Sequence, residues 1–132
     1  MKYMLDTNIC IYAIKNKPEK VLNTLKEKMN DGICISAITL AELAHGVEKS
    51  AAREKNRAAL LRFLSILTVL PFDDLAAAEY GEVCADLQRK GTPIGTMDML
   101  IAAHAKTEGL ILVINNTREF ERVQGLTLEN WV

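Results

Sequence analysis

Residues 4–12, MLDTNICIY, place an acid inside an otherwise apolar stretch. The apolar residues up to Leu5 predict a short strand, and those from Ile9 onward predict a helix. Asp6 therefore falls where a strand passes into a helix, and the polar residues Thr7 and Asn8 follow it. An aspartate at this point either caps the helix or belongs to a site assembled from several such interruptions.

Strands and helices alternate along the rest of the chain. Apolar runs bounded by turn residues predict strands, and apolar residues spaced three or four apart predict helices. The expected strands are residues 2–5, 32–36, 68–72 (stopped by Pro71) and 110–114, with an edge strand at 126–130. The expected helices are 9–14, 21–25, 38–47, 51–67, 74–90 and 97–105. Because parallel neighbours need crossover connections, this order favours an α/β fold with a mainly parallel central sheet of four to five strands flanked by helices.

Composition limits the class of protein further. A chain of 132 residues, of which 49% are hydrophobic and 25% charged, fits a single domain over residues 1–132. No apolar run approaches the roughly 20 residues of a membrane span, and no signal-peptide layout opens the chain, so we expect a cytoplasmic location. The net charge of -1 gives no overall attraction to nucleic acid. Cys10, Cys34 and Cys84 lack CxxC spacing and are expected to be buried free thiols.

Polar residues recur where a strand ends or the next helix starts. Asp6 ends the first strand, Glu42 lies in the helix after the second, Asp98 opens the helix after GTPIGT, and NNTRE at 115–119 follows the last strong strand. In a parallel sheet these points lie along one edge, where ligands bind at the switch in strand order. We therefore expect the three acids to converge.

Helix capping is the alternative explanation for each residue taken singly. Asp6 fits an N-cap, and Asp98 would favour the dipole of its helix. The spacings Thr39-x-x-Glu42 and Asn116-x-x-Glu119 fit capping boxes. Capping does not explain why successive elements each supply an acid at the same edge of the sheet. Carboxylates brought close together repel one another, and a bound cation removes that repulsion.

The oxygen ligands select the cation. Carboxylates suit Mg²⁺, for which Mn²⁺ can substitute, better than zinc, and the two histidines, His45 and His104, are expected to be packing or surface residues. Mg²⁺ held by carboxylates commonly binds substrate phosphates, which favours hydrolysis of a phosphodiester. Thr7, Asn8 and Ser36 are candidates for orienting the ligands or a water molecule, with capping and turn formation as an equal alternative.

Binding of RNA would also need local positive charge. The basic residues near the proposed edge are Lys15, Lys17, Lys20, Arg89, Lys90, Arg118 and Arg122. They could form a groove with positive charge despite the net balance, although most such residues are solvated surface. Tyr12 is a candidate for stacking on a base, with a core position as the alternative.

Four segments resemble the PIN-domain ribonucleases and, within them, the VapC toxins of bacterial toxin–antitoxin modules. They are MLDTN at the start, SAITLAEL around Glu42, IGTMDMLIAAHA around Asp98 and LVINNTREFERV near the end, and they span nearly the whole chain. The resemblance implies that Asp6, Glu42 and Asp98 are the metal-binding and catalytic residues. Many relatives carry an aspartate where this chain has NNTRE, so Asn116 and Glu119 are both candidates for a fourth position.

The resemblance also implies a substrate and partners. A chain of this kind would be a Mg²⁺-dependent endoribonuclease toxin that cleaves tRNA and blocks translation. In the subgroup that this chain resembles most, the target is the anticodon stem-loop of initiator tRNA. The protein would be a homodimer neutralised by a VapB antitoxin, whose C-terminal segment occupies the active-site groove and through which the complex binds operator DNA.

Three other functions stay open on the residues alone. A signalling receiver domain requires an acidic pair after the first strand, whereas Asp73 and Asp74 follow the third and look like a helix start. A phosphatase with an aspartyl nucleophile requires Asp-x-Asp, and here Asn8 replaces the second acid. A vestigial, non-catalytic RNA-binding module would tolerate replacement of Asp6 or Asp98.

Overall fold

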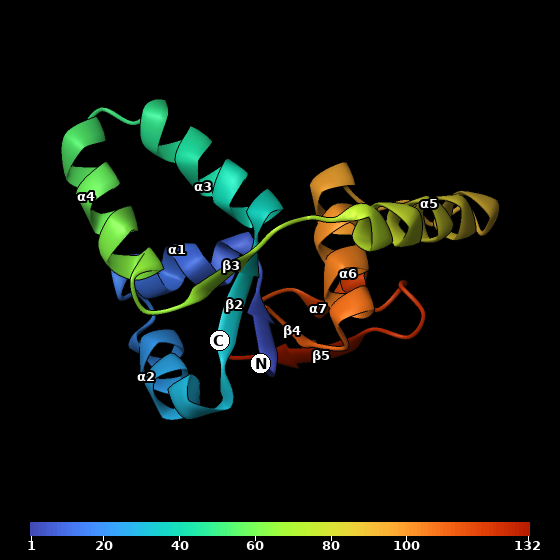
Figure 1. The fold of residues 1–132 in the computed structure, drawn as a ribbon, viewed down its shortest axis with the longest axis horizontal. Helices are drawn as coiled ribbons and strands as arrows, with labels where there is room; N and C mark the ends of the chain where they lie inside the picture. Colours follow the sequence, from blue (N-terminus) through green and yellow to red (C-terminus); the bar gives the residue numbers. More distant parts are fainter.

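The computed structural model describes residues 1–132 and contains a five-stranded parallel sheet with helices on both faces (Figure 1). The strands are β1 (Tyr3–Leu5), β2 (Ile33–Ser36), β3 (Thr68–Leu70), β4 (Ile111–Ile114) and β5 (Thr127–Asn130). The helices are α1 (Thr7–Lys15), α2 (Glu19–Lys28), α3 (Ala37–Glu48), α4 (Arg53–Leu64), α5 (Asp74–Arg89), α6 (Thr96–Glu108) and α7 (Thr117–Phe120), with a 3₁₀ turn at Met29–Asp31. The expected α/β class is confirmed.

The strand order is β3-β2-β1-β4-β5, and every neighbouring pair is parallel. The chain builds outward from β1 through β2 to β3 and then crosses to the other side of β1 to form β4 and β5. The order therefore reverses between β1 and β4, which is the place where open α/β sheets bind ligands. The expected edge strand at residues 126–130 is confirmed as β5.

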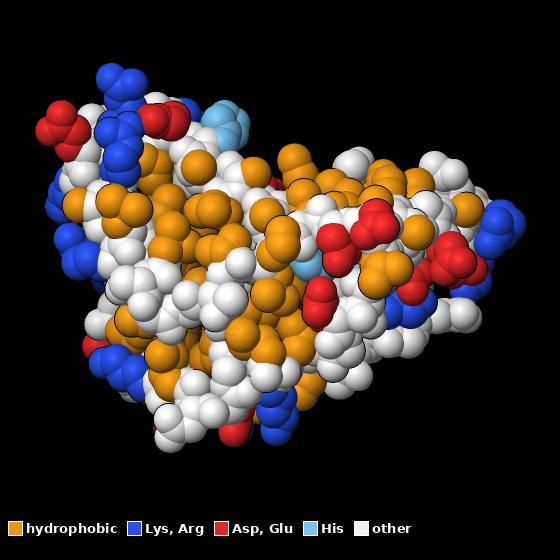
Figure 2. Space-filling model, viewed as in Figure 1, with side chains coloured by type: hydrophobic (Ala, Val, Ile, Leu, Met, Phe, Trp, Pro, Cys, Tyr) orange, Lys and Arg blue, Asp and Glu red, His pale blue; other side chains and the backbone are white.

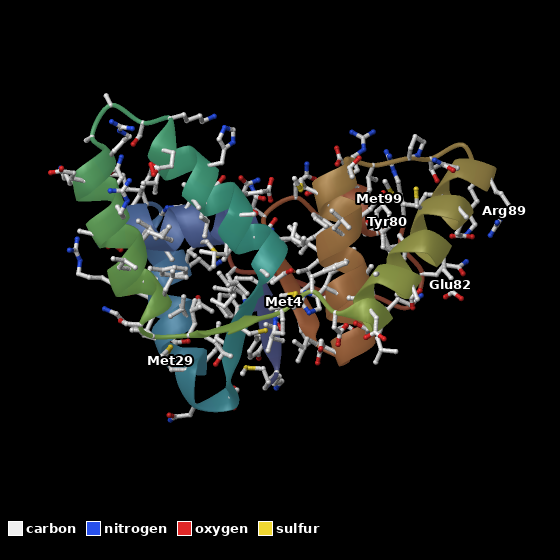
Figure 3. The ribbon with its side chains drawn as sticks, turned by 45° about the horizontal axis from the view of Figure 1, so that its top comes forward. Met4, Met29, Tyr80, Glu82, Arg89 and Met99 are labelled. Carbon is white, nitrogen blue, oxygen red and sulfur yellow. The ribbon has the colours of Figure 1, made fainter.

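Alternation along the strands decides which helices cover which face. Met4 packs in one core with Val83 of α5 and Ile101 of α6. Its neighbours Tyr3 and Leu5 point the other way, into a second core formed mainly with α1 to α4. Figure 1 shows α5 and α6 on one side of the sheet and α1 to α4 on the other, and Figure 3 places Met4 between them. Burial on both faces explains why β1, β2 and β4 are continuous apolar runs.

One expectation about local structure needs correction, and one is confirmed. Helix α3 begins at Ala37, directly after β2, and its N-cap is Ser36, whose hydroxyl accepts from the backbone of Ile38. Thr39 therefore lies inside the helix, where it is completely buried, and the expected capping box between Thr39 and Glu42 is wrong. The sequence misplaced the cap because no loop separates strand from helix. The third strand was expected to be stopped by Pro71, and β3 does end at Leu70, because proline cannot donate to the ladder.

The state of the cysteines and the character of the helices can be compared with the expectations drawn from composition. All three cysteines are free, Cys10 and Cys34 are buried as expected, and Cys84 is only half-buried. None of the helices combines the length and the hydrophobicity that crossing a bilayer demands.

Candidate metal centre at the carboxyl edge of the sheet

Asp6 is the residue at which β1 passes into α1. Its amide donates to the carbonyl oxygen of Val113 in β4 at 3.0 Å, and its Oδ1 accepts from the amide of Ile9 at 2.9 Å. The residue is only 5% exposed. Burial raises the pKa of the carboxyl to about 7 against the lowering effect of the bond from Ile9, and the charges of Asp98 and Glu42 raise it as well. Asp6 thus caps α1 as expected, but at a position where its charge is costly.

Glu42 reaches the start of α1 from the second turn of α3. Its Oε1 accepts a hydrogen bond of 2.5 Å from the hydroxyl of Thr7, which lies 35 residues earlier in the chain. The expectation that Thr7 orients an acid therefore has a direct structural counterpart. Because Thr7 follows Asp6, this bond also ties α3 to the element that carries the buried carboxyl.

Asp98 lies in the first turn of α6, whose N-cap Gly95 supplies no side-chain bond. The carboxyl is half-buried. Burial is the main cause that raises its pKa, and the charges of Glu119 and Glu42 raise it further. Asp98 therefore interacts electrostatically with acids from three other elements, those that carry Asp6, Glu42 and Glu119.

The two candidates for a fourth position differ in their surroundings. Asn116 is exposed, and its Oδ1 accepts from the amide of Arg118 at 3.2 Å, so its oxygen caps α7. Glu119 is half-buried on α7, and its charge acts on Asp98. Of the two, Glu119 is the residue that the fold turns towards the other acids.

The carboxylates are close enough to perturb one another, yet they do not form a closed ligand cage. No group of three or more His, Cys, Asp or Glu side chains lies close enough together to hold a metal ion as placed. The side chains account for this spacing, because Glu42 is turned to Thr7 and Asp6 to the amide of Ile9. The donor set nevertheless fits Mg²⁺ or Mn²⁺, because all its atoms are carboxylate oxygens. Burial and repulsion between the acids both raise the pKa values of Asp6 and Asp98, and a divalent cation would relieve the repulsion.

Two other expected orienting residues lie differently. Ser36 is completely buried, and its hydroxyl is used by the amide of Ile38 and by the ring of His104. It therefore does not bond to the acids. Asn8 is exposed, and its backbone N–H lowers the pKa of Asp6. The alternative explanation for Ser36, helix capping, is confirmed.

Two pairs of helices stand apart above the sheet, with an opening between them. The pair α3 and α4 stands on one side and the pair α5 and α6 on the other (Figure 1), and the outline of the space-filling view is notched between them (Figure 2). Beside Glu42, a pocket of about 310 Å³ lies between α1, α3 and α4 and is lined by Lys15, Ile14, Leu43 and Leu60.

The basic residues named from the sequence differ in their surroundings. Lys15 lines the pocket beside Glu42, and Arg122 donates to the carbonyl oxygen of Pro93 at 3.0 Å, in the loop that leads to α6. Arg89 projects from the far end of α5 (Figure 3), and Lys90 pairs with Asp86 at 3.0 Å. The remaining three, Lys17, Lys20 and Arg118, are exposed.

The sequence did not predict a pair of polar contacts made by Asn115. The carboxamide of Asn115, after β4, donates to the hydroxyl of Tyr12 in α1 at 3.0 Å, and Asn130, in β5, donates to the carbonyl oxygen of Asn115 at 3.4 Å. Tyr12 is half-buried, so neither a pure core role nor free stacking describes it. Residues more than 100 positions apart form the bond between Tyr12 and Asn115, and only the strand order brings them together.

Comparison with known proteins decides the family, because residues 3–126 match the PIN domain. The chain belongs to the PIN-domain family. This PIN domain is 50% identical over 134 residues to the tRNA(fMet)-specific endonuclease VapC of Salmonella typhimurium, covering 99% of this chain and 98% of that one. It is 51% identical over 132 residues to ribonuclease VapC2 of Haemophilus influenzae, covering 100% and 99%.

Solved structures agree with this assignment. VapBC2 from Rickettsia felis, bound to a DNA fragment from its promoter, superposes on the PIN domain with a TM-score of 0.95 at 45% identity and 100% coverage of both chains. DNA-bound VapBC from Salmonella typhimurium gives a TM-score of 0.95 at 49% identity, with 100% and 99% coverage. The expected family, a VapC-type PIN domain, and the expected enzyme class, a ribonuclease, are confirmed. A receiver domain or an aspartyl phosphatase is thereby set aside.

Proposed function

We propose that this chain is a Mg²⁺-dependent endoribonuclease toxin that hydrolyses phosphodiester bonds of tRNA in the cytoplasm and so inhibits translation. Initiator tRNA is the proposed target, supported by the name of the 50% identical Salmonella relative. The observation that carries the proposal is the buried Asp6 carboxyl at the point where the strand order reverses, with Asp98 and Glu42 close enough for their charges to raise its pKa further.

The carboxylates are the proposed ligands of the metal ion. Asp6 and Asp98 would hold the ion with Glu42, and Glu119 is the proposed fourth ligand. A divalent cation here supplies stabilisation of the negative charge on the phosphate, and Mn²⁺ can substitute for Mg²⁺. The chain fixes Asp6 through the bonds with Val113 and Ile9, which limits reorganisation when substrate binds.

The neighbouring groups position the RNA and the acids. The hydrogen bond from Thr7 to Glu42 joins the start of α1 to α3 and so fixes the distance between these two helices, near which Asp6 and Glu42 lie. The first-turn amides of α1 and α6 give partial positive charge at the same edge, which favours a phosphate. Lys15, in the pocket beside Glu42, and Arg122, beside the loop that leads to α6, are the proposed contacts for the flanking backbone phosphates.

We further propose that the protein is a homodimer held inactive by a VapB-type antitoxin, and that the complex binds operator DNA through the antitoxin. The full-length likeness to chains of VapBC assemblies solved with DNA supports this. The apolar pocket beside Glu42 would receive a segment of the antitoxin at the entrance to the acids.

An assay on tRNA tests the activity. Purified protein, freed of antitoxin, is incubated with total tRNA with and without Mg²⁺ or Mn²⁺, beside folded Asp6→Asn and Asp98→Asn variants, and the cut ends are mapped. We expect cleavage only with metal and only with both acids present. Cleavage that survives metal removal or both substitutions would contradict the mechanism, and no cleavage of any RNA by metal-loaded protein would favour a vestigial binding module.

A further inference from the structure

A buried polar contact joins two of the acid-bearing helices. His104, on α6, is completely buried, and its Nδ1 lies 2.8 Å from the hydroxyl of Ser36, which is equally buried at the start of α3. The two residues are 68 positions apart in the chain. The ring of Phe72 packs edge-on against the imidazole, with centroids 5.4 Å apart. Water is thus excluded from this contact, so each polar atom depends on its protein partner.

The contact lies at matching positions on the two helices. Ser36 precedes Glu42 by less than two helical turns, and His104 follows Asp98 by the same number of residues. Helices α3 and α6 lie on the two sides of the notch (Figures 1 and 2). A shift of α6 against α3 at this point would therefore change the separation between the carboxylates of Glu42 and Asp98.

The hydrogen bonds around Ser36 and His104 determine which ring nitrogen of His104 carries the proton. The Ser36 oxygen already accepts from the amide of Ile38 at 3.1 Å, so the serine proton is free to be donated to Nδ1 of His104. The ring proton then lies on Nε2, which is buried without a hydrogen-bond partner and 4.0 Å from Oε1 of Glu108. The opposite tautomer would leave the serine proton unpaired and point a lone pair at that carboxylate. Burial lowers the pKa of His104, against the charges of Glu108 and Asp73, which keeps the ring neutral.

We propose that His104, acting through Ser36, is a positioning residue that locks α6 against α3 and so sets the spacing of the Asp98 and Glu42 carboxylates. The inference rests on the proposed function, because it assigns these acids to one metal centre. A purely apolar contact at the same place would permit several side-chain packings of similar energy, whereas a directional bond between buried groups selects one.

Three variants test the role, with the Mn²⁺ ion alone as probe. His104→Leu keeps an apolar side chain in the core but removes the bond, and His104→Asn places an amide oxygen near the position of Nδ1, where Ser36 can donate to it. Val21→Ala is the control. Val21 is completely buried in the other core, so its truncation destabilises the fold but leaves the bond between His104 and Ser36 intact. Mn²⁺ binding is measured without RNA by electron paramagnetic resonance, and kcat and KM are measured on tRNA.

We expect His104→Leu to weaken Mn²⁺ binding and lower kcat, each by about tenfold, with KM changed less than about twofold. His104→Asn should recover most of both losses, and Val21→Ala should keep the wild-type values at a similar loss of Tm. If His104→Leu matches Val21→Ala in Mn²⁺ affinity and kcat, the positioning role is wrong, even though inactivity of Asp6→Asn would still support the proposed function. Metal-independent cleavage by the wild-type protein would overturn the proposed function instead.

The ring itself provides a test that needs no substitution. Nitrogen-15 NMR of the wild-type protein should show His104 neutral, with its proton on Nε2 and with Nδ1 as an acceptor. A proton on Nδ1 would overturn the assigned bond and, with it, the inference.

Discussion

Asp6 and Asp73 occupy the same local position in two parts of the molecule. Each follows a strand and caps the next helix: Oδ1 of Asp6 accepts from Ile9 at 2.9 Å, and Oδ1 of Asp73 accepts from Ala76 at 3.0 Å. Asp6 is buried near Asp98, whereas Asp73 is exposed. Capping therefore explains why an aspartate occurs at both places, and it explains neither the burial of Asp6 nor its acidic neighbours.

The topology accounts for the difference. Asp6 follows β1, the central strand, whose end is enclosed by β4 and by the helices that start at the same edge. Asp73 follows β3, which lies at the edge of the sheet opposite to β5. An ionised capping aspartate therefore loses little hydration at the rim of the sheet and much at its centre. The fold tolerates this desolvation of Asp6, which keeps a charged group in place.

The largest expected difference between the two aspartates is in catalysis. Asp6→Asn should lower the rate of tRNA cleavage by about a thousandfold, because the amide cannot balance the charge of the cation, while it still caps α1. Asp73→Asn should change the rate by less than about twofold. Cleavage rates on tRNA with saturating Mg²⁺ measure both. Equal rates in the two variants would remove the distinction between the two caps.

The pH dependence of stability should differ next. Aspartate in the unfolded chain has a pKa of 3.8, and burial raises the pKa of Asp6 to about 7, so the folded chain binds this proton more tightly. The metal-free protein should therefore lose about 3 kcal/mol of its free energy of unfolding as the pH rises from about 4 to about 7. Urea denaturation in EDTA at several pH values measures this. Asp6→Asn should show a much smaller loss, because only Asp98 then has a raised pKa, and Asp73→Asn should retain the full loss. A wild-type protein that gains stability over this range would show that Asp6 is not held as described.

Metal should reverse that cost. At a Mg²⁺ concentration one hundred times the dissociation constant, binding stabilises the folded state by about 2.7 kcal/mol, which raises Tm by several degrees. The wild-type protein and Asp73→Asn should both show this rise in thermal denaturation, and Asp6→Asn should show little of it. A similar rise in all three would place the ion away from Asp6.

The smallest effect is that of the cap itself. Asp73→Ala should lower the free energy of unfolding by about 1 kcal/mol, because the amide of Ala76 loses its partner, and Asp73→Ser should recover most of the loss. Activity should stay unchanged in both. A loss of activity in Asp73→Ala at full stability would mean that the edge strand takes part in the site.

The sequence predicted the fold well because the strands and the helices differ in period. All five strands, including the edge strand at Thr127–Asn130, lie where the apolar runs indicated, and Asp73 was correctly expected at a helix start. The cap of α3 was misplaced, because Ser36 ends a strand and starts a helix at once, which no loop composition marks.

The site was predicted only as a set of residue types along one edge. The sequence could place Asp6, Glu42 and Asp98 at that edge through the strand-to-helix order, but it could not show that Glu42 bonds to Thr7 or that Glu119 acts on Asp98. These contacts join residues distant in the chain, and side-chain rotation decides them. His104 was expected to be a packing or surface residue, and its complete burial shows that it packs inside the protein. Its bond to Ser36 has no local signature in the sequence.

The most direct test is the position of a bound metal ion. Crystals soaked with Mn²⁺ should show one strong anomalous peak at about 2.0–2.3 Å from carboxylate oxygens of Asp6 and Asp98, with Glu42 as a further ligand. A peak elsewhere on the protein, or none at a Mn²⁺ concentration that supports cleavage, would contradict the assignment of these acids to a single metal centre.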